Sequence, residues 1–142
     1  MDEADDEPVH DGAALAPRVD VVAAVGGLEA MRAILRDLYA RLAADLMIGF
    51  FFRGRDLDQL VEHQLRFTAR SLGADVIYEG RPIPEAHAAL PPILPGHFDR
   101  RHALLATVLA DHAVPADARD AWLAYDRSFR RAVLAPRRPA RP

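Results

Sequence analysis

The feature that most limits how this chain can fold is a helical repeat of apolar residues, interrupted by glycine and proline. Apolar residues recur every three or four positions over residues 28–44 and again over 56–72, the spacing that gives an α-helix one apolar face. The repeat returns over 96–112 and in a last segment from 114 to about 134. Since no segment shows the alternation of a half-buried strand, the sequence predicts an all-α chain of about five helices.

The breaks between these segments contain residues that favour turns and helix ends. Gly26-Gly27 stands directly before the first long helix, and adjacent glycines allow positive φ or close backbone approach at a helix-to-helix corner. Asp56 or Asp58 can cap the next helix, and Gly73 ends it. Between these helices, residues 45–54 hold three of the six phenylalanines. They predict either a corner that fills the core or a place where one ring packs against a flat cofactor.

The composition excludes several kinds of chemistry. The chain has no cysteine, which removes disulfides, thiolate metal sites and iron–sulfur clusters. All 18 basic residues are arginine, so lysine Schiff bases and a phosphate-loop lysine are absent too. A formal net charge of −3 argues against nucleic acid as a partner. No Gly-x-Ser-x-Gly or His-Glu-x-x-His motif occurs, and we assign no catalytic residue.

The two ends differ from the middle of the chain. Residues 1–17 include five acidic residues among the first seven, and we expect a disordered acidic arm there. Residues 18–135 are expected to form one folded domain, followed by a Pro/Arg-rich tail over 136–142. The acidic start is unlike a signal peptide, and no apolar run approaches the ~20 residues that span a bilayer. We therefore expect a cytoplasmic protein that does not engage a membrane.

Polar side chains on an apolar helix face indicate where a site lies. Leu60, His63, Gln64 and Phe67 are spaced i, i+3, i+4 and i+7, so they share one face. A buried glutamine needs several hydrogen-bond partners and a buried histidine needs at least one. Something polar should therefore lie between this helix and its neighbour. The alternative for His63 is a half-solvated position at the rim.

The other histidines separate into one candidate ligand and several surface residues. His87 shares a face with Ile83 and Leu90 on a short segment that opens with two prolines. One imidazole offered to the interior suits a metal-bearing cofactor better than an enzyme site. His102 and His112 lie within one predicted helix, ten residues apart, which is not the i, i+4 spacing of a helical metal pair. We interpret these two as solvated surface residues.

In order and spacing, these motifs resemble those of the truncated haemoglobins, most closely the first group of that family. The resemblance runs from about residue 19 to residue 133, and it implies a 2-on-2 α-helical sandwich, a globin-like fold, around non-covalent haem b. It rests on Gly26-Gly27, Asp37-Leu-Tyr39, Phe51-Phe52-x-Gly54, His63-Gln64, Leu72-Gly73, Tyr78-x-Gly80-Arg-Pro, Glu85-Ala-His87 and His97-Phe98.

The resemblance implies a role for each candidate site residue. His87 is expected to be the proximal iron ligand, and Tyr39 and Gln64 to hydrogen-bond the ligand on the distal side. His63 has two roles open to it: a sixth iron ligand when no gas is bound, or a partner for a haem propionate. The expected haem contacts also include Phe52, Leu60, Phe67, Tyr78 and Phe98.

The function implied by the resemblance is reversible binding of O2, NO and CO, for oxygen transport or storage or for gas sensing. A hydroxyl that donates to a partly negative ligand slows its escape, so tight O2 binding is expected. With electrons from a reductase, such a pocket could also convert O2 and NO to nitrate. We expect a monomer or a weak dimer. The alternative is a haem-free all-α interaction module in which the histidine and glutamine are merely buried polar groups.

Overall fold

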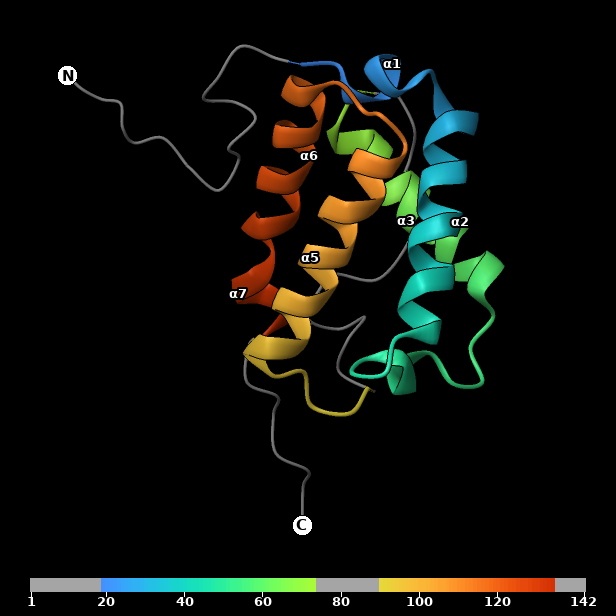
Figure 1. Ribbon diagram of the computed structural model, residues 1–142, viewed down its shortest axis with the longest axis vertical. Helices are drawn as coiled ribbons and strands as arrows, with labels where there is room; N and C mark the ends of the chain where they lie inside the picture. The colour runs from blue at the N-terminus through green and yellow to red at the C-terminus, as the bar shows by residue number, and fades with distance from the viewer. Residues whose placement is uncertain (1–18, 74–89, 135–142) are drawn as a thin grey trace, which may run out of the picture.

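The computed structural model describes residues 19–73 and 90–134 (Figure 1). These residues contain α1 (Val21–Val25), α2 (Leu28–Ala44), the 3-10 helix η3 (Gly49–Phe52), α3 (Leu57–Ser71), α5 (Pro95–Asp111), α6 (Ala116–Ser128) and α7 (Arg130–Val133). No strand occurs in this part of the chain, and the all-α expectation is confirmed. The terminal arm, the tail and the short segment with His87 lie outside the described residues.

Two pairs of helices make up the body of the fold. α2 packs against α3 and α5 packs against α6, while contacts between α2 and α5 join the pairs. Figure 1 shows α5 and α6 running side by side. The connection between them is only a few residues long, because α5 ends at Asp111 and α6 starts at Ala116, and short connections give antiparallel neighbours. Ala113 takes a positive φ of 55° in this turn.

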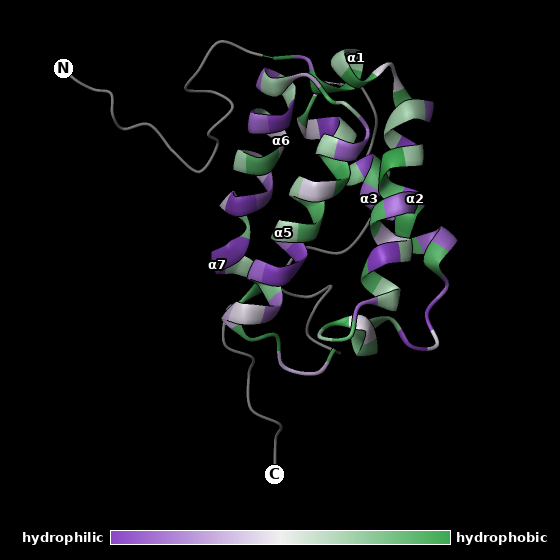
Figure 2. Cartoon of the chain, viewed as in Figure 1, coloured by the Kyte–Doolittle hydropathy of each residue, from purple (hydrophilic) through white to green (hydrophobic). Residues whose placement is uncertain are grey.

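The core lies between α2 and the other long helices. Each long helix in Figure 2 carries both apolar and charged residues, as an amphipathic helix should. The largest fully buried side chains are Met31, Leu35, Leu38 and Leu42 on α2, Val61 and Thr68 on α3, and Leu105, Val108 and Leu109 on α5, with Val21 on α1. Among the described residues, no helix is long and apolar enough to cross a bilayer.

The corner formed by Gly26 and Gly27 sets where α2 begins. Both glycines take positive φ, 109° and 106°, as the sequence predicts. The Gly27 N–H donates to the Val22 carbonyl at 2.8 Å, and the Val22 N–H donates to the Leu72 carbonyl at 3.2 Å. The corner therefore ties α1 to the end of α3 and fixes the start of the helix that carries Tyr39.

We expect Gly26→Ala to destabilise the fold by roughly 1–2 kcal/mol, because an L-residue in the left-handed region carries about that cost. The added Cβ would also lie 3.3 Å from the Ala30 Cβ. Urea unfolding at neutral pH measures the difference. The matched control is Gly96→Ala on α5, where the new Cβ meets only the Met47 Cε at 3.4 Å. Equal effects of the two substitutions would contradict the role of the corner.

Candidate functional site

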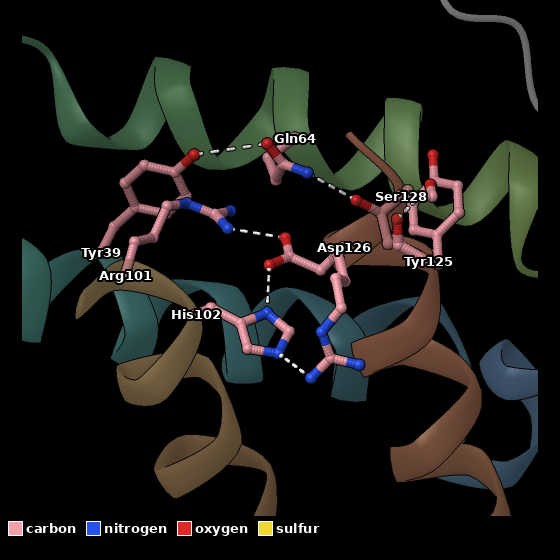
Figure 3. Close-up of polar contacts among 9 residues, drawn as sticks. Tyr39, Gln64, Arg101, His102, Tyr125, Asp126 and Ser128 are labelled. Carbon is pink, nitrogen blue, oxygen red and sulfur yellow. Dashed lines mark hydrogen bonds and ion pairs between the residues drawn. The ribbon is translucent and has the colours of Figure 1, made fainter. Parts of the chain in front are cut away.

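A hydrogen-bonded chain joins α2 to α3 at the candidate site. Tyr39 is only 8% exposed, and its hydroxyl donates to the Gln64 Oε1 at 3.4 Å, a long hydrogen bond. The Gln64 Nε2 donates to the Thr68 Oγ1 at 2.6 Å, and Thr68 is buried. Figure 3 shows Tyr39 and Gln64 pointing toward one another from the two helices. The structure therefore brings together the two residues expected on the distal side.

The apolar residues expected around the site lie on η3 and α3. The Phe52 ring stands edge-on to the Tyr39 ring, with 5.8 Å between centroids. Phe52, Leu60 and Phe67 are all half-buried, as is Gln64. On the adjacent face of α3, Val61 and other residues are fully buried against the core. The predicted face of α3 is thus only partly covered, and it lies between the buried core face and an exposed face that carries Gln59, Arg66 and Arg70.

His63 and Phe98 occupy different positions from these residues. His63 shares the α3 face but is exposed, which matches the rim position that the sequence left open. Phe98 is buried on α5, and its ring lies nearly parallel to that of His102, with 6.3 Å between centroids. Tyr78 and His87 lie outside the described residues.

The aromatic corner differs from the simplest expectation. The corner residue that is fully buried is Ile48, whereas Phe50 is 39% exposed. Phe50 and Phe51 stack on each other with centroids 4.2 Å apart, and both stand edge-on to His97. Only Phe52 turns its ring toward Tyr39. The three rings therefore do not fill the core together as one unit.

A charged group that sequence reasoning missed lies beside Tyr39. The Arg101 Nη1 lies 2.6 Å from the Asp126 Oδ1, and the two side chains are 23% and 12% exposed. The Asp126 Oδ2 contacts the His102 Nδ1 at 2.8 Å, and the His102 Nε2 contacts Arg127 at 3.0 Å. Figure 3 places the Arg101 guanidinium between Tyr39 and Asp126. The polar cluster thus extends from α2 and α3 across to α5 and α6.

One expectation about histidine is wrong. His102 is not a solvated surface residue: its side chain is only 16% exposed, because Asp126 and Arg127 from α6 cover both ring nitrogens. His112 is exposed as expected, although its Nε2 lies 2.9 Å from the Asp37 Oδ2.

The ionisation of the cluster follows from burial and from neighbouring charges. Burial raises the pKa of the Tyr39 hydroxyl above its ordinary value, although the nearby Arg101 acts in the opposite direction. Burial also acts to raise the pKa of Asp126, but Arg101 and His102 outweigh it, and the pKa stays below the usual value. The pKa of Arg101 is raised because Asp126 and Tyr39 outweigh the effect of its burial. At neutral pH the site holds a neutral phenol beside an ionised Arg–Asp pair.

The sequence did contain a signal for this pair. Arg101 follows Phe98 by three residues and precedes Leu105 by four, so it falls on the buried stripe of α5. Asp126 follows the buried Trp122 by four residues on α6. Opposite charges on the inward faces of two consecutive antiparallel helices indicate a buried ion pair. Among the described residues, no three His, Asp or Glu side chains are grouped so as to hold a metal ion.

Comparison with known proteins agrees with this arrangement. The family described as bacterial-like globin matches residues 20–135. Group 1 truncated hemoglobin GlbN from Mycolicibacterium paratuberculosis is 31% identical over 93 residues, which is 66% of this chain and 68% of that protein. Group 1 truncated hemoglobin GlbN from a Nostoc species is 28% identical over 110 residues, 78% and 92% of the two chains. The crystal structure of truncated hemoglobin from Tetrahymena pyriformis in its Fe(III) form is similar with a TM-score of 0.74 and 26% identity, covering 80% of this chain and 97% of that one.

Two packed helix pairs, together with the similarity to a solved truncated hemoglobin, define the class as a 2-on-2 globin. The chain belongs to the bacterial-like globin family, and the resemblance to group 1 truncated haemoglobins is confirmed. Haem binding follows from that family. The described residues fit such a group on the distal side, because two neutral donors stand beside half-buried aromatic and aliphatic side chains. The Arg101–Asp126 pair is charged and so differs from these aromatic and aliphatic side chains.

We expect Asp126→Asn to cost about 3–5 kcal/mol at pH 7, because it leaves Arg101 buried without its counter-charge. The pKa of Asp126 is lowered in the folded protein. The stability that its ionised carboxylate contributes is therefore fully present above the unfolded pKa of about 4, and it is lost as pH falls through the folded pKa. The gap between wild type and variant should therefore shrink below about pH 4.

Chemical unfolding across a pH series measures that gap. The control is Asp99→Asn, which removes an exposed ion pair with Arg130 and should cost much less, because water screens charges at the surface. A cost at Asp126 no larger than that at Asp99, or one that persists unchanged in acid, would contradict the account of the buried pair.

Proposed function

We propose that this globin holds haem b non-covalently, with His87 as proximal iron ligand, and binds O2, NO or CO on the side of Tyr39 and Gln64. The observation that carries the proposal is the contact between the Tyr39 hydroxyl and the Gln64 amide, made between α2 and α3 beside the half-buried Phe52. The role of His87 rests on its spacing from these residues in the family motif, since it lies outside the described residues.

The residues of the chain act mainly by hydrogen bonding. Haem, when bound, supplies the ferrous iron that takes a diatomic gas. Tyr39 stays a donor at neutral pH because burial keeps its pKa high and its hydroxyl protonated. Its single O–H donates to the Gln64 Oε1 in this structure and would turn to the ligand when one binds. Gln64 has two amide protons, of which Thr68 accepts one, and we assign the other to the ligand. Each hydrogen bond contributes about 0.5–1.5 kcal/mol, and more for a charged acceptor.

The apolar residues keep water away from this donor pair. Phe52, Leu60 and Phe67 are the half-buried side chains on the same side of η3 and α3, and they are suited to pack on the porphyrin. Burial in such surroundings strengthens the hydrogen bonds that Tyr39 and Gln64 can make. Phe98, buried on α5, is proposed to contact the edge of the group.

The exposure of His63 supports one of its two candidate roles. The side chain lies at the open side of α3 rather than inside the hydrogen-bonded chain. A charged carboxylate at the solvent edge is a partner that an exposed imidazole can reach without losing its hydration. We therefore favour the propionate contact over ligation of the iron.

The first test is haem binding itself. Purified protein mixed with hemin should show a Soret band, and His87→Ala should abolish it because the proximal ligand is lost. His112→Ala, an exposed histidine directly after α5, should bind hemin normally. A colourless wild-type protein would leave the haem-free interaction module as the better account. Extraction of the haem by acidic organic solvent should be complete if attachment is non-covalent.

The second test concerns the distal donors. We expect Tyr39→Phe to speed O2 dissociation at least about tenfold, because it removes a hydrogen bond to a partly charged ligand, an interaction that contributes roughly 1.5–3 kcal/mol. Gln64→Leu should act in the same direction. Stopped-flow displacement of O2 by CO measures the rates. Tyr125→Phe is the matched control, since its hydroxyl donates to the Phe67 carbonyl at 3.4 Å instead. Equal rates for Tyr39→Phe and wild type would remove Tyr39 from the proposed pocket.

The third test decides the role of His63. Absorption spectra of the ferric and ferrous proteins without gas report whether a sixth ligand makes the iron low-spin. If His63 contacts a propionate, His63→Ala leaves these spectra unchanged and weakens only haem retention. A change from low-spin to high-spin spectra on substitution would instead identify His63 as the sixth ligand.

A further inference from the structure

We propose that Arg101 is a further ligand-contacting residue of the distal pocket, and that its guanidinium makes this globin bind small anions, such as azide and nitrite, more tightly than the Tyr39–Gln64 pair would by itself. The inference rests on the proposed function, since the anion is taken to bind at the same haem face. Arg101 reaches this position from α5, whereas Tyr39 and Gln64 come from α2 and α3.

The first support is the direction of the side chain. An arginine that served only to pair with Asp126 would need no contact with α2. Here the guanidinium lies between Asp126 and Tyr39 (Figure 3), and its charge acts to lower the pKa of the phenol. Tyr39 in turn contacts Gln64. Polar side chains from α2, α3 and α5 therefore lie in one region (Figure 3).

The second support is that the guanidinium is held in place. The Arg101 Nη1 bonds the Asp126 Oδ1 at 2.6 Å, and Asp126 is itself held by the His102 Nδ1 at 2.8 Å. His102 also contacts Arg127 at 3.0 Å. A guanidinium has five N–H donors in a rigid fork, and a single ion-pair contact to Asp126 leaves others directed elsewhere. A donor that is already oriented loses little entropy when an anion binds.

The third support is the distribution of charge. Among the described residues, Arg101 and Asp126 are the charged groups that act on Tyr39. Asp126 lies behind the guanidinium as seen from Tyr39 (Figure 3), so the positive end of the pair faces the two neutral donors. Both side chains are largely shielded from water. Charge interactions are stronger in such a shielded position than at the surface. The arrangement favours an anion over a neutral ligand.

The test compares an anionic and a neutral ligand on the hemin-reconstituted protein. Arg101→Leu should weaken azide binding to the ferric form at least about tenfold, the loss of one charge-assisted hydrogen bond. Equilibrium affinity of the ferrous form for CO should change less than about twofold, since CO is uncharged. The C–O stretch of the carbonyl complex should move to higher frequency when the positive field is removed.

The matched control is Arg100→Leu. It removes the same charge one residue earlier, from an arginine that is 45% exposed and pairs with Asp45 at 2.7 Å. Azide affinity should remain near the wild-type value. Equal losses in the two variants would overturn the proposal, because net charge alone would then explain the effect.

Two further variants separate a direct contact from indirect effects. In a Tyr39→Phe background, Arg101→Leu should still weaken azide binding. If azide affinity does not fall further in that background, Arg101 acts only by positioning Tyr39. If Arg101→Leu does not fold, the double variant Arg101→Leu/Asp126→Leu removes both buried charges and should show the same loss of azide affinity. Wild-type azide affinity in that double variant would overturn the proposal.

Failure of this inference is distinguishable from failure of the proposed function. If wild-type protein does not bind hemin, both fall. If hemin binds and Tyr39→Phe speeds O2 dissociation while azide affinity is the same with and without Arg101, the haem and donor assignments stand and only the anion inference is overturned.

Discussion

The packing of α2 is the constraint on which the rest of the described structure depends. This helix contacts α1, η3, α3 and α5, and its inward side chains, from Met31 to Leu42, are almost completely buried. Burial of that stripe fixes the rotation of the helix about its axis. Tyr39 follows directly after Leu38 of the stripe, and its side chain contacts Gln64 of α3 and lies beside Arg101 of α5 (Figure 3). The position of the polar site is a consequence of apolar packing.

The site combines two kinds of polar interaction with different costs. The contact of Tyr39 with Gln64 involves neutral groups, which are inexpensive to bury once they are paired. The Arg101–Asp126 pair costs more, because two charges leave water and their attraction only partly offsets the loss. Its presence next to Tyr39 and Gln64 is the reason to assign it a part in ligand choice as well.

Much of the helical framework was predictable from local sequence. The periodic segment 28–44 coincides with α2, and 56–72 differs from α3 by one residue at each end. The Asp56 side chain caps α3 as expected, accepting from the Gln59 N–H at 3.1 Å. The last helix is the exception, since it divides at Phe129 into α6 and α7. No glycine or proline marks that division, so a pattern of turn residues could not reveal it.

The sequence by itself determined which segments are helical and which face of each is apolar, because those properties depend on residues three or four positions apart. Together with the family motif it also identified Tyr39 and Gln64. Only the tertiary structure decided that Arg101, His102 and Asp126 meet beside them. The spacing of Arg101 and Asp126 from buried residues indicates that both face inward, but their pairing also depends on how α5 and α6 are rotated and how closely they approach, which helical spacing does not determine.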